Sequence, residues 1–222
     1  MSQTETLMAR DGHTFSTYIA KPPGKPRGAV VVAQEIFGLA PHILRVADSY
    51  AQQGYLSLAP ALFDRIARGI VLGYSPTEVE QGLGYRKQIS TAQAVLDIAA
   101  AVAVCRHAGK VAVIGFCWGG RLAWAAASEL TLGAAVVYYG GGLLEELPKT
   151  PKCPTMLHFG IHDRSIPLED VERLDAAFPA GSFHLYEAGH AFNNEDRPQN
   201  YNASASMLAR ERTAAFLSLH IG

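Results

Sequence analysis

Four side chains able to take part in hydrolytic chemistry occur at wide intervals along the 222-residue chain: Glu35, Cys117, Asp163 and His190. Each follows a short apolar run and stands near a glycine. A cysteine thiol becomes a strong nucleophile when a histidine takes its proton, and a carboxylate holds that histidine in the required tautomer. These residue types therefore predict nucleophilic catalysis by Cys117, with His190 as the base and Asp163 as the acid that orients it.

The nucleophile candidate lies in the stretch from Val111 to Gly120, VAVIGFCWGG. Its apolar start is typical of a strand buried on both faces, and the alanine-rich sequence that follows favours a helix. The chain must reverse between Gly115 and Gly119, where glycines relieve crowding and let a reactive side chain project, as in the G-x-S-x-G nucleophile elbow. Free cysteines often only fill space in a core, so packing is the alternative role for Cys117.

The positions of the other candidates fit one site. Parallel strands gather reactive groups at their carboxyl ends, and the order cysteine, aspartate, histidine is the order found in α/β-hydrolases. Glu35 ends an apolar run in the same way, where an unpaired glutamate is an unusual structural choice. The backbone N–H groups of Ile36 and Trp118 are the expected donors to an oxyanion formed during the reaction.

Each candidate also has a simpler interpretation. Asp163 is a residue type that often forms turns or caps helices, here the helix expected after Pro167. His190 is one of eight histidines, and it competes with His162 for the role of base. Cys105, on an apolar helix, and Cys153, beside a proline, are expected to be packing residues.

The pattern of apolar runs predicts alternating strands and helices. Expected strands are 14–20, 29–33, 56–59, a run from 111, 132–139, 155–159 and 182–186. Expected helices are 41–53, 85–107, 121–129, 168–178 and 203–219, with a long, poorly patterned segment at 62–84. Such alternation with short links predicts a mostly parallel central sheet with helices on both faces. The length suits a single α/β domain over residues 1–222.

Composition excludes several classes of partner. The formal net charge is −1, from 19 basic and 20 acidic residues spread along the chain, so neither a nucleic acid nor an anionic membrane is an expected partner. No apolar run approaches membrane-spanning length, and the polar N-terminus does not resemble a secretory signal. Three cysteines without metal-like spacing fit a reducing compartment, so we expect a cytoplasmic protein.

With these residues in place, the chain resembles the dienelactone hydrolases, also called carboxymethylenebutenolidases. The likeness covers nearly the whole chain, through QEIFG at 34–38, GFCWGG at 115–120, G-x-x-D at 160–163 and GH-x-F at 189–192. The resemblance implies an α/β-hydrolase fold and a Cys117–His190–Asp163 triad. It also implies that Glu35 contacts the thiol and accepts its proton when substrate arrives, with Ile36 and Trp118 forming the oxyanion hole.

One departure from the family pattern concerns the substrate. The dienelactone-cleaving members hold the substrate carboxylate with arginines, one of them four residues after the histidine, and here that position is Asn194. Arg197 is the nearest basic residue downstream, and Arg86 supplies a second charge at the expected junction of loop and helix. Asn194, Arg197 and Arg86 are therefore the expected substrate-binding residues. The missing arginine predicts a weaker requirement for a substrate carboxylate.

The leading hypothesis is a hydrolase without cofactor or metal ion that cleaves a small ester or lactone through an acyl-enzyme on Cys117. General carboxylester or thioester cleavage at the same site is the first alternative. A non-catalytic, thiol-sensing protein is the second, but a sensor needs only a reactive thiol and not the full set of four residues. We expect a monomer or a small homo-oligomer.

Overall fold

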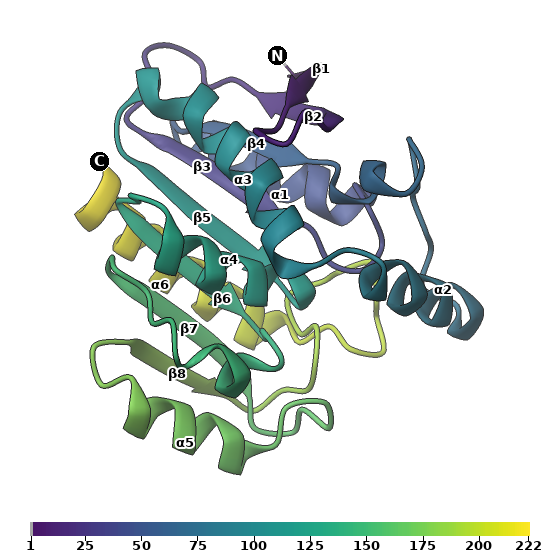
Figure 1. The fold of residues 1–222 in the computed structure, drawn as a ribbon. Coiled ribbons are helices and arrows are strands. Elements are labelled where there is room, and N and C mark those ends of the chain that lie inside the picture. Colours follow the sequence, from purple (N-terminus) through teal and green to yellow (C-terminus); the bar gives the residue numbers. More distant parts are fainter. Residues whose placement is uncertain (1) are drawn as a thin grey trace.

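One eight-stranded sheet runs through the computed structural model, which describes residues 2–222 (Figure 1). The strand order is β1-β2-β4-β3-β5-β6-β7-β8. The strands are β1 (Ser2–Met8), β2 (Thr14–Ala20), β3 (Ala29–Ala33), β4 (Leu56–Pro60), β5 (Val111–Phe116), β6 (Ala134–Tyr138), β7 (Thr155–Gly160) and β8 (Ser182–Tyr186). From β4 to β8 all neighbours pair in parallel, whereas β1 and β2 are antiparallel to their partners. The mostly parallel sheet predicted from sequence is confirmed.

Helices cover both faces of this sheet. In Figure 1, α3 (Thr91–Cys105), α4 (Trp118–Glu129) and α5 (Leu168–Ala177) lie in front of the strands, and α1 (Pro41–Gln52) and α6 (Ala203–Ile221) lie behind them. Every residue of the central strands β3, β4, β5, β6 and β7 is buried, because each strand has a helix layer on either side. This explains why these strands appear in the sequence as unbroken apolar runs.

Two expectations about single elements are corrected. Strand β1 was not predicted, because six of its seven residues are exposed and its sequence SQTETLM has no apolar alternation. The helix expected over 85–107 consists of two helices, α2 (Pro76–Lys87) and α3, which turn between Gln88 and Ser90. Helix α2 begins inside the segment expected to be irregular. Each helix starts with a capping box, Ser75 with Glu78 and Ser90 with Gln93, which satisfies the free N–H groups of its first turn.

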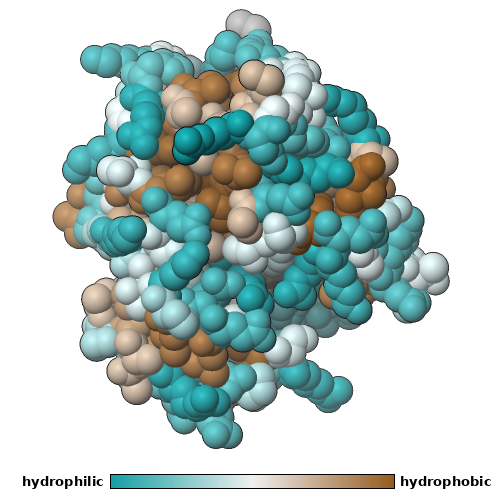
Figure 2. Space-filling model, in the orientation of Figure 1, coloured by the Kyte–Doolittle hydropathy of each residue, from teal (hydrophilic) through white to brown (hydrophobic). Residues whose placement is uncertain are grey.

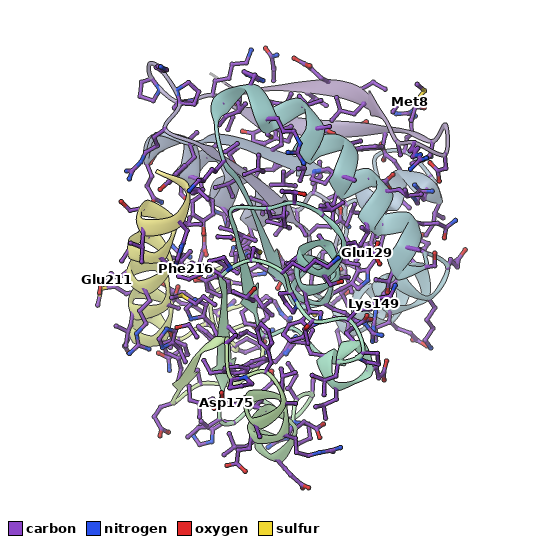
Figure 3. All side chains as sticks on the ribbon, turned by 60° about the vertical axis from the view of Figure 1, so that its left-hand side comes forward. Met8, Glu129, Lys149, Asp175, Glu211 and Phe216 are labelled. Atoms are coloured by element: carbon purple, nitrogen blue, oxygen red, sulfur yellow. The ribbon has the colours of Figure 1, made fainter. Side chains whose placement is uncertain are left out.

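Helix α6 shows how the outer helices divide between core and solvent. Thr213, Leu217 and Ile221, four residues apart, are buried against the sheet. Figure 3 shows Glu211 pointing away from the sheet on the opposite side of the helix. On the face seen in Figure 2, hydrophobic residues form separate groups between hydrophilic side chains. No single helix among residues 2–222 has the length and hydropathy to cross a membrane; only α2 together with 91–108 passes that test, and the pair is bent by 88°.

Candidate active site

Cys117 occupies a sharp turn between β5 and α4. Its φ of 53° and ψ of −115° lie outside the regions that non-glycine residues favour, so the turn holds the residue in a strained conformation. Glycines make this turn possible. A Cβ atom on Gly115 would lie 1.8 Å from the carbonyl oxygen of Gly119, and one on Gly119 would lie 2.2 Å from that of Ala33. The Cys117 side chain is partly exposed and lines a cavity, as expected for an elbow.

The thiol is the first member of a chain of hydrogen-bonded groups from three strand ends. The Sγ atom of Cys117 lies 3.2 Å from Nε2 of His190, and Nδ1 of His190 lies 2.7 Å from Oδ2 of Asp163. Asp163 follows β7 and is buried, and its other oxygen accepts a hydrogen bond of 2.8 Å from the N–H of Ser165. The structure thus brings together the three residues expected from sequence. His162 lies apart from them, bonded to Glu187 on the surface.

The charges around His190 favour its protonated form. Burial alone would lower its pKa, but the negative charge of the Cys117 sulfur and the hydrogen bond to Asp163 raise the pKa of His190 to about 10. A protonated histidine favours the thiolate form of a neighbouring cysteine, and the thiolate is the form that acts as a nucleophile.

Glu35 lies just after β3 and is buried, but its hydrogen bond goes to Asn194 and not to the thiol. The Nδ2 atom of Asn194 donates to Oε2 of Glu35 at 2.7 Å, and Oε1 of Glu35 has no partner among residues 2–222. Asn194 is fully buried and does not contribute to the lining of the cavity that holds Cys117. The structure therefore places Asn194 behind the site, as the residue that orients Glu35.

Tyr139 is a neighbour of these groups that the sequence analysis missed. It is buried, has a φ of 39°, and its ring centroid lies 5.2 Å from that of His190. Burial first, and then the negative charges of Glu35 and Cys117, raise the pKa of Tyr139 well above its usual value. Its hydroxyl therefore stays neutral, and it has no partner in the part of the chain that the structure describes. Its place after a buried strand and before three glycines was the available signal.

The two residues expected to form an oxyanion hole line the same cavity as the Cys117 thiol. Ile36 and Trp118 both line the cavity, and Trp118 is the first residue of α4. The N–H groups of a helix's first turn have no partner inside the helix. Within residues 2–222, neither N–H donates to another backbone carbonyl. Both groups are free to bind a negatively charged oxygen.

The cavity has a volume of about 450 Å³ and contains three arginines. Arg86 and Arg197 line it, as expected for substrate-binding residues, and Arg121 is a third that the sequence analysis did not single out. Arg86 lies in the last turn of α2 and not at the start of a helix, which corrects its expected setting. The guanidinium of Arg197 lies over the rings of Phe37 and Tyr74, at 5.5 and 5.7 Å from their centroids.

The three arginines differ in their partners. Arg121 forms ion pairs with Glu145 at 2.9 Å and with Glu146 at 2.8 Å. The structure pairs neither Arg86 nor Arg197 with a carboxylate among the residues that it describes, and Nε of Arg197 is buried without a hydrogen-bond partner. These two cationic groups therefore face the cavity without an ion pair to any carboxylate of residues 2–222.

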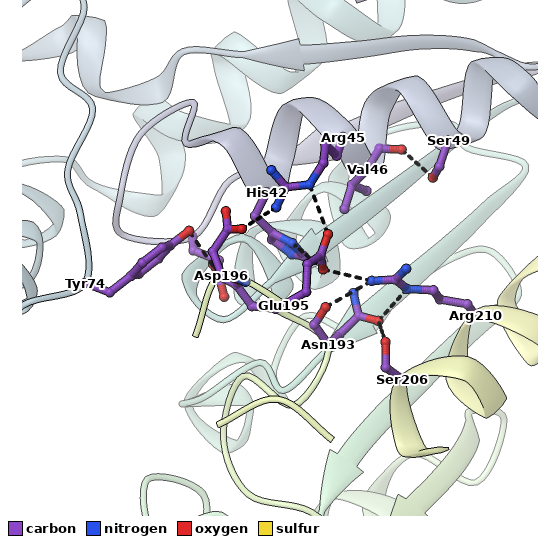
Figure 4. A network of polar contacts seen from close by, with 12 residues as sticks. His42, Arg45, Val46, Ser49, Tyr74, Asn193, Glu195, Asp196, Ser206 and Arg210 are labelled. Carbon is purple, nitrogen blue, oxygen red and sulfur yellow. Dashed lines mark hydrogen bonds and ion pairs between the residues drawn. The ribbon is translucent and has the colours of Figure 1, made fainter. Parts of the chain in front are cut away.

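The segment that follows His190 is fixed by a network of ion pairs, drawn in Figure 4. Glu195 contacts His42 at 3.2 Å and Arg45 at 3.1 Å from α1, and Arg210 at 3.1 Å from α6. Arg210 also donates to the side chain and to the backbone carbonyl of Asn193. Burial would raise the pKa of Glu195, but the hydrogen bonds from His42 and Arg45 hold it well below its usual range. The network joins α1 and α6 and fixes the segment that carries Asn194.

A mostly parallel sheet with a cysteine elbow, a histidine and an acid at its strand ends defines the class of the α/β-hydrolases, and the protein is an enzyme of the hydrolase class. The chain belongs to the dienelactone hydrolase family, whose model matches residues 15–221. It is 34% identical to the carboxymethylenebutenolidase of Pseudomonas putida over 96% of this chain and 94% of that protein. It is 31% identical to carboxymethylenebutenolidase 1 of Cupriavidus pinatubonensis, over 99% and 97% of the two chains.

Solved structures agree with this family. A candidate dienelactone hydrolase from Klebsiella pneumoniae superimposes with a TM-score of 0.83 at 28% identity, covering 98% of both chains. A dienelactone hydrolase-like promiscuous phosphotriesterase from metagenomic libraries superimposes with a TM-score of 0.79 at 20% identity, covering 100% of this chain and 99% of the other. At that lower identity the second structure shows a shared fold only.

Proposed function

We propose that the protein cleaves a small ester or lactone through a covalent acyl-enzyme on Cys117. The continuous contact from Cys117 through His190 to Asp163, at 3.2 and 2.7 Å, is the observation that carries this proposal. The names of the curated relatives, which are carboxymethylenebutenolidases, support a lactone as substrate. A cavity of about 450 Å³ fits a small molecule.

The proposed reaction has two steps. The Cys117 sulfur attacks the carbonyl carbon, and the N–H groups of Ile36 and Trp118 stabilise the resulting oxyanion. When this intermediate collapses, the bond between the carbonyl carbon and the ring or ester oxygen breaks. The departing oxygen takes a proton from His190. His190 then removes a proton from water, the water oxygen attacks the thioester carbon, and the acid product leaves as the sulfur regains its electron pair.

Thioester or general carboxylester cleavage would use the same groups, and the cavity does not distinguish between these leaving groups. A binding or sensing protein is less well supported, because it has no use for Asp163 buried against His190 or for the Ile36 and Trp118 N–H groups, which have no backbone partner among residues 2–222. A panel of lactones, aryl esters and thioesters, compared by kcat/KM, separates the hydrolytic alternatives.

The nucleophile is tested by replacing each cysteine. Cys117→Ala is expected to abolish turnover while the chain still folds, because its side chain is only partly buried and packs at the edge of the core. Cys105→Ala and Cys153→Ala are the matched controls and should keep activity, since burial raises the pKa of Cys105 to about 12 and that of Cys153 to about 11. Mass spectrometry should find the acyl group on Cys117. An active Cys117→Ala variant, with inactivation by iodoacetamide at Cys105 or Cys153, would show that the proposal is wrong.

A further inference from the structure

One wall of the active-site cavity is formed by α2, a helix that lies at the right-hand edge of the molecule, apart from the helices that cover the sheet (Figure 1). Val79, Leu83 and Arg86 line the cavity from this helix. Their spacing of four and three residues places them on one helix face. Leu83 is 40% exposed, so a large apolar side chain faces the cavity and not the core.

Helix α2 contacts the rest of the site through a glycine. Gly82 is the one buried residue of α2, and a Cβ atom on it would lie 2.2 Å from the carbonyl oxygen of Ile36 and 3.2 Å from its carbonyl carbon. The helix backbone therefore rests directly on the carbonyl group of Ile36. Ile36 also supplies, through its N–H group, one of the two expected oxyanion donors. The contact with Gly82 therefore sets the position of the α2 wall relative to a residue of the reacting centre.

Ile36 is packed more tightly into the protein than helix α2 is. Ile36 is 6% exposed and belongs to the hydrophobic core between β3 and α1. Helix α2 has no other buried residue, although its Tyr85 ring lies 5.6 Å from that of Phe63. Because real Cβ atoms do not approach a backbone oxygen to 2.2 Å, a side chain at position 82 must displace one of the two partners. The helix has fewer contacts to lose, so it is the helix that moves outward.

We propose that Gly82 is a specificity-determining residue: it fixes the distance of α2 from Ile36 and thereby the length of substrate that fits between the α2 wall and Cys117. This proposal rests on the proposed hydrolytic function. A larger residue at position 82 moves Val79 and Leu83 away from the thiol, which weakens contacts to short substrates and admits longer ones. The oxyanion donors stay in place, so the chemical step keeps its rate.

The test compares Gly82→Ala with Gly84→Ala. Both substitutions remove a glycine from the interior of the same helix and favour helical structure equally, but a Cβ atom on Gly84 meets nothing within 4 Å. Two substrate series are measured, aryl esters from acetate to hexanoate and alkyl acetates from ethyl to hexyl. In Gly82→Ala we expect KM for the short esters to rise, kcat to stay within about twofold, and the long-to-short ratio of kcat/KM to rise roughly tenfold in at least one series. Gly84→Ala should match the wild type.

Three results would overturn the proposal: unchanged ratios in Gly82→Ala, the same change in Gly84→Ala, or a loss of kcat that is equal for all lengths. Leu83→Ala shortens the same wall and leaves Gly82 against the Ile36 carbonyl, so it should also favour the longer esters. A wild-type ratio in Leu83→Ala overturns the proposal even if Gly82→Ala does not fold. These outcomes are distinct from failure of the proposed function, which is shown by an active Cys117→Ala variant.

Discussion

Among single residues, Asn194 has the role that differs most from its expected one. It was expected at the substrate, but its amide holds Oε2 of Glu35 at 2.7 Å and accepts from the N–H of Asp196 at 3.0 Å. The chain turns just after the histidine, at Ala191 with a φ of 60°, before Asn194 enters the interior. Such a turn decides whether a residue four places after a histidine faces a cavity or the core. No sequence pattern predicts a turn of this kind. Tyr139, at a φ of 39°, was missed for the same reason.

A substrate carboxylate is expected to improve cleavage, although the sequence alone favoured little discrimination. Arg86 and Arg197 face the cavity without an ion pair to residues 2–222, and a well-formed charged hydrogen bond is worth roughly 1.5–3 kcal/mol, or about 10- to 150-fold. The measurement compares kcat/KM for an anionic lactone and its neutral methyl ester. The preference should fall in Arg86→Ala and in Arg197→Ala, and Lys87→Ala, an exposed neighbour on α2, serves as the control. Equal rates for the acid and the ester in the wild type would contradict this expectation.

Among the helices and strands, those that depend on their own local sequence could be predicted. The strand–elbow–helix unit around Cys117 could be predicted, because each of its parts indicates one structure. The apolar run indicates a buried strand, the two glycines a tight turn and the alanine-rich continuation a helix. The sequence also contains a signal for the break between α2 and α3, the capping pair Ser90 and Gln93. The apolar residues on both sides of this pair nevertheless led to the prediction of one continuous helix. Strand β1 could not be predicted, because its pairing with β2 supplies the order that its own exposed residues do not.

The elbow should not tolerate a larger residue at Gly119. A Cβ atom there would lie 2.2 Å from the carbonyl oxygen of Ala33 and 2.6 Å from that of Gln34, so α4 must move away from β3. Gly119→Ala is expected to lower the free energy of unfolding by about 1–3 kcal/mol, the usual cost of overpacking, and to slow alkylation of Cys117. Urea unfolding and iodoacetamide kinetics measure the two effects. Gly84→Ala is again the control, and wild-type stability in Gly119→Ala would show that the close approach does not constrain the turn.

In the molecule as a whole, the ion-pair network around Glu195 joins parts that are distant in sequence. It brings together α1, α6 and the segment after His190 (Figure 4). Both helices lie on the side of the sheet opposite α3 and α4 (Figure 1). Its partners come from the first and last quarters of the chain, so no local pattern could have predicted it. The site depends on it through Asn194, which lies inside the same segment.

Acid should weaken this network. The pKa of Glu195 is below its usual value of 4.5 in the folded state, so its stabilising contribution is complete above about pH 4.5 and is lost as the pH falls toward the folded-state pKa. Glu195→Gln should lower Tm at pH 7, by roughly 2–4 °C for each ~1 kcal/mol of hydrogen bonding lost. The difference from the wild type should shrink below pH 4.5. Glu211→Gln, on the exposed face of α6, is the control, and a difference that stays constant with pH would contradict this role.

The spread of the site along the chain affects how the enzyme acquires its activity. Residues 35, 117, 163 and 190 come together only when β3, β5, β7 and β8 occupy one sheet, and parallel neighbours pair across long stretches of sequence. Contacts between distant residues form late and slowly in folding. During refolding, helical circular dichroism should therefore return before hydrolytic activity. On the ribosome, the growing chain stays inactive until the segment that carries His190 has emerged and docked on α1.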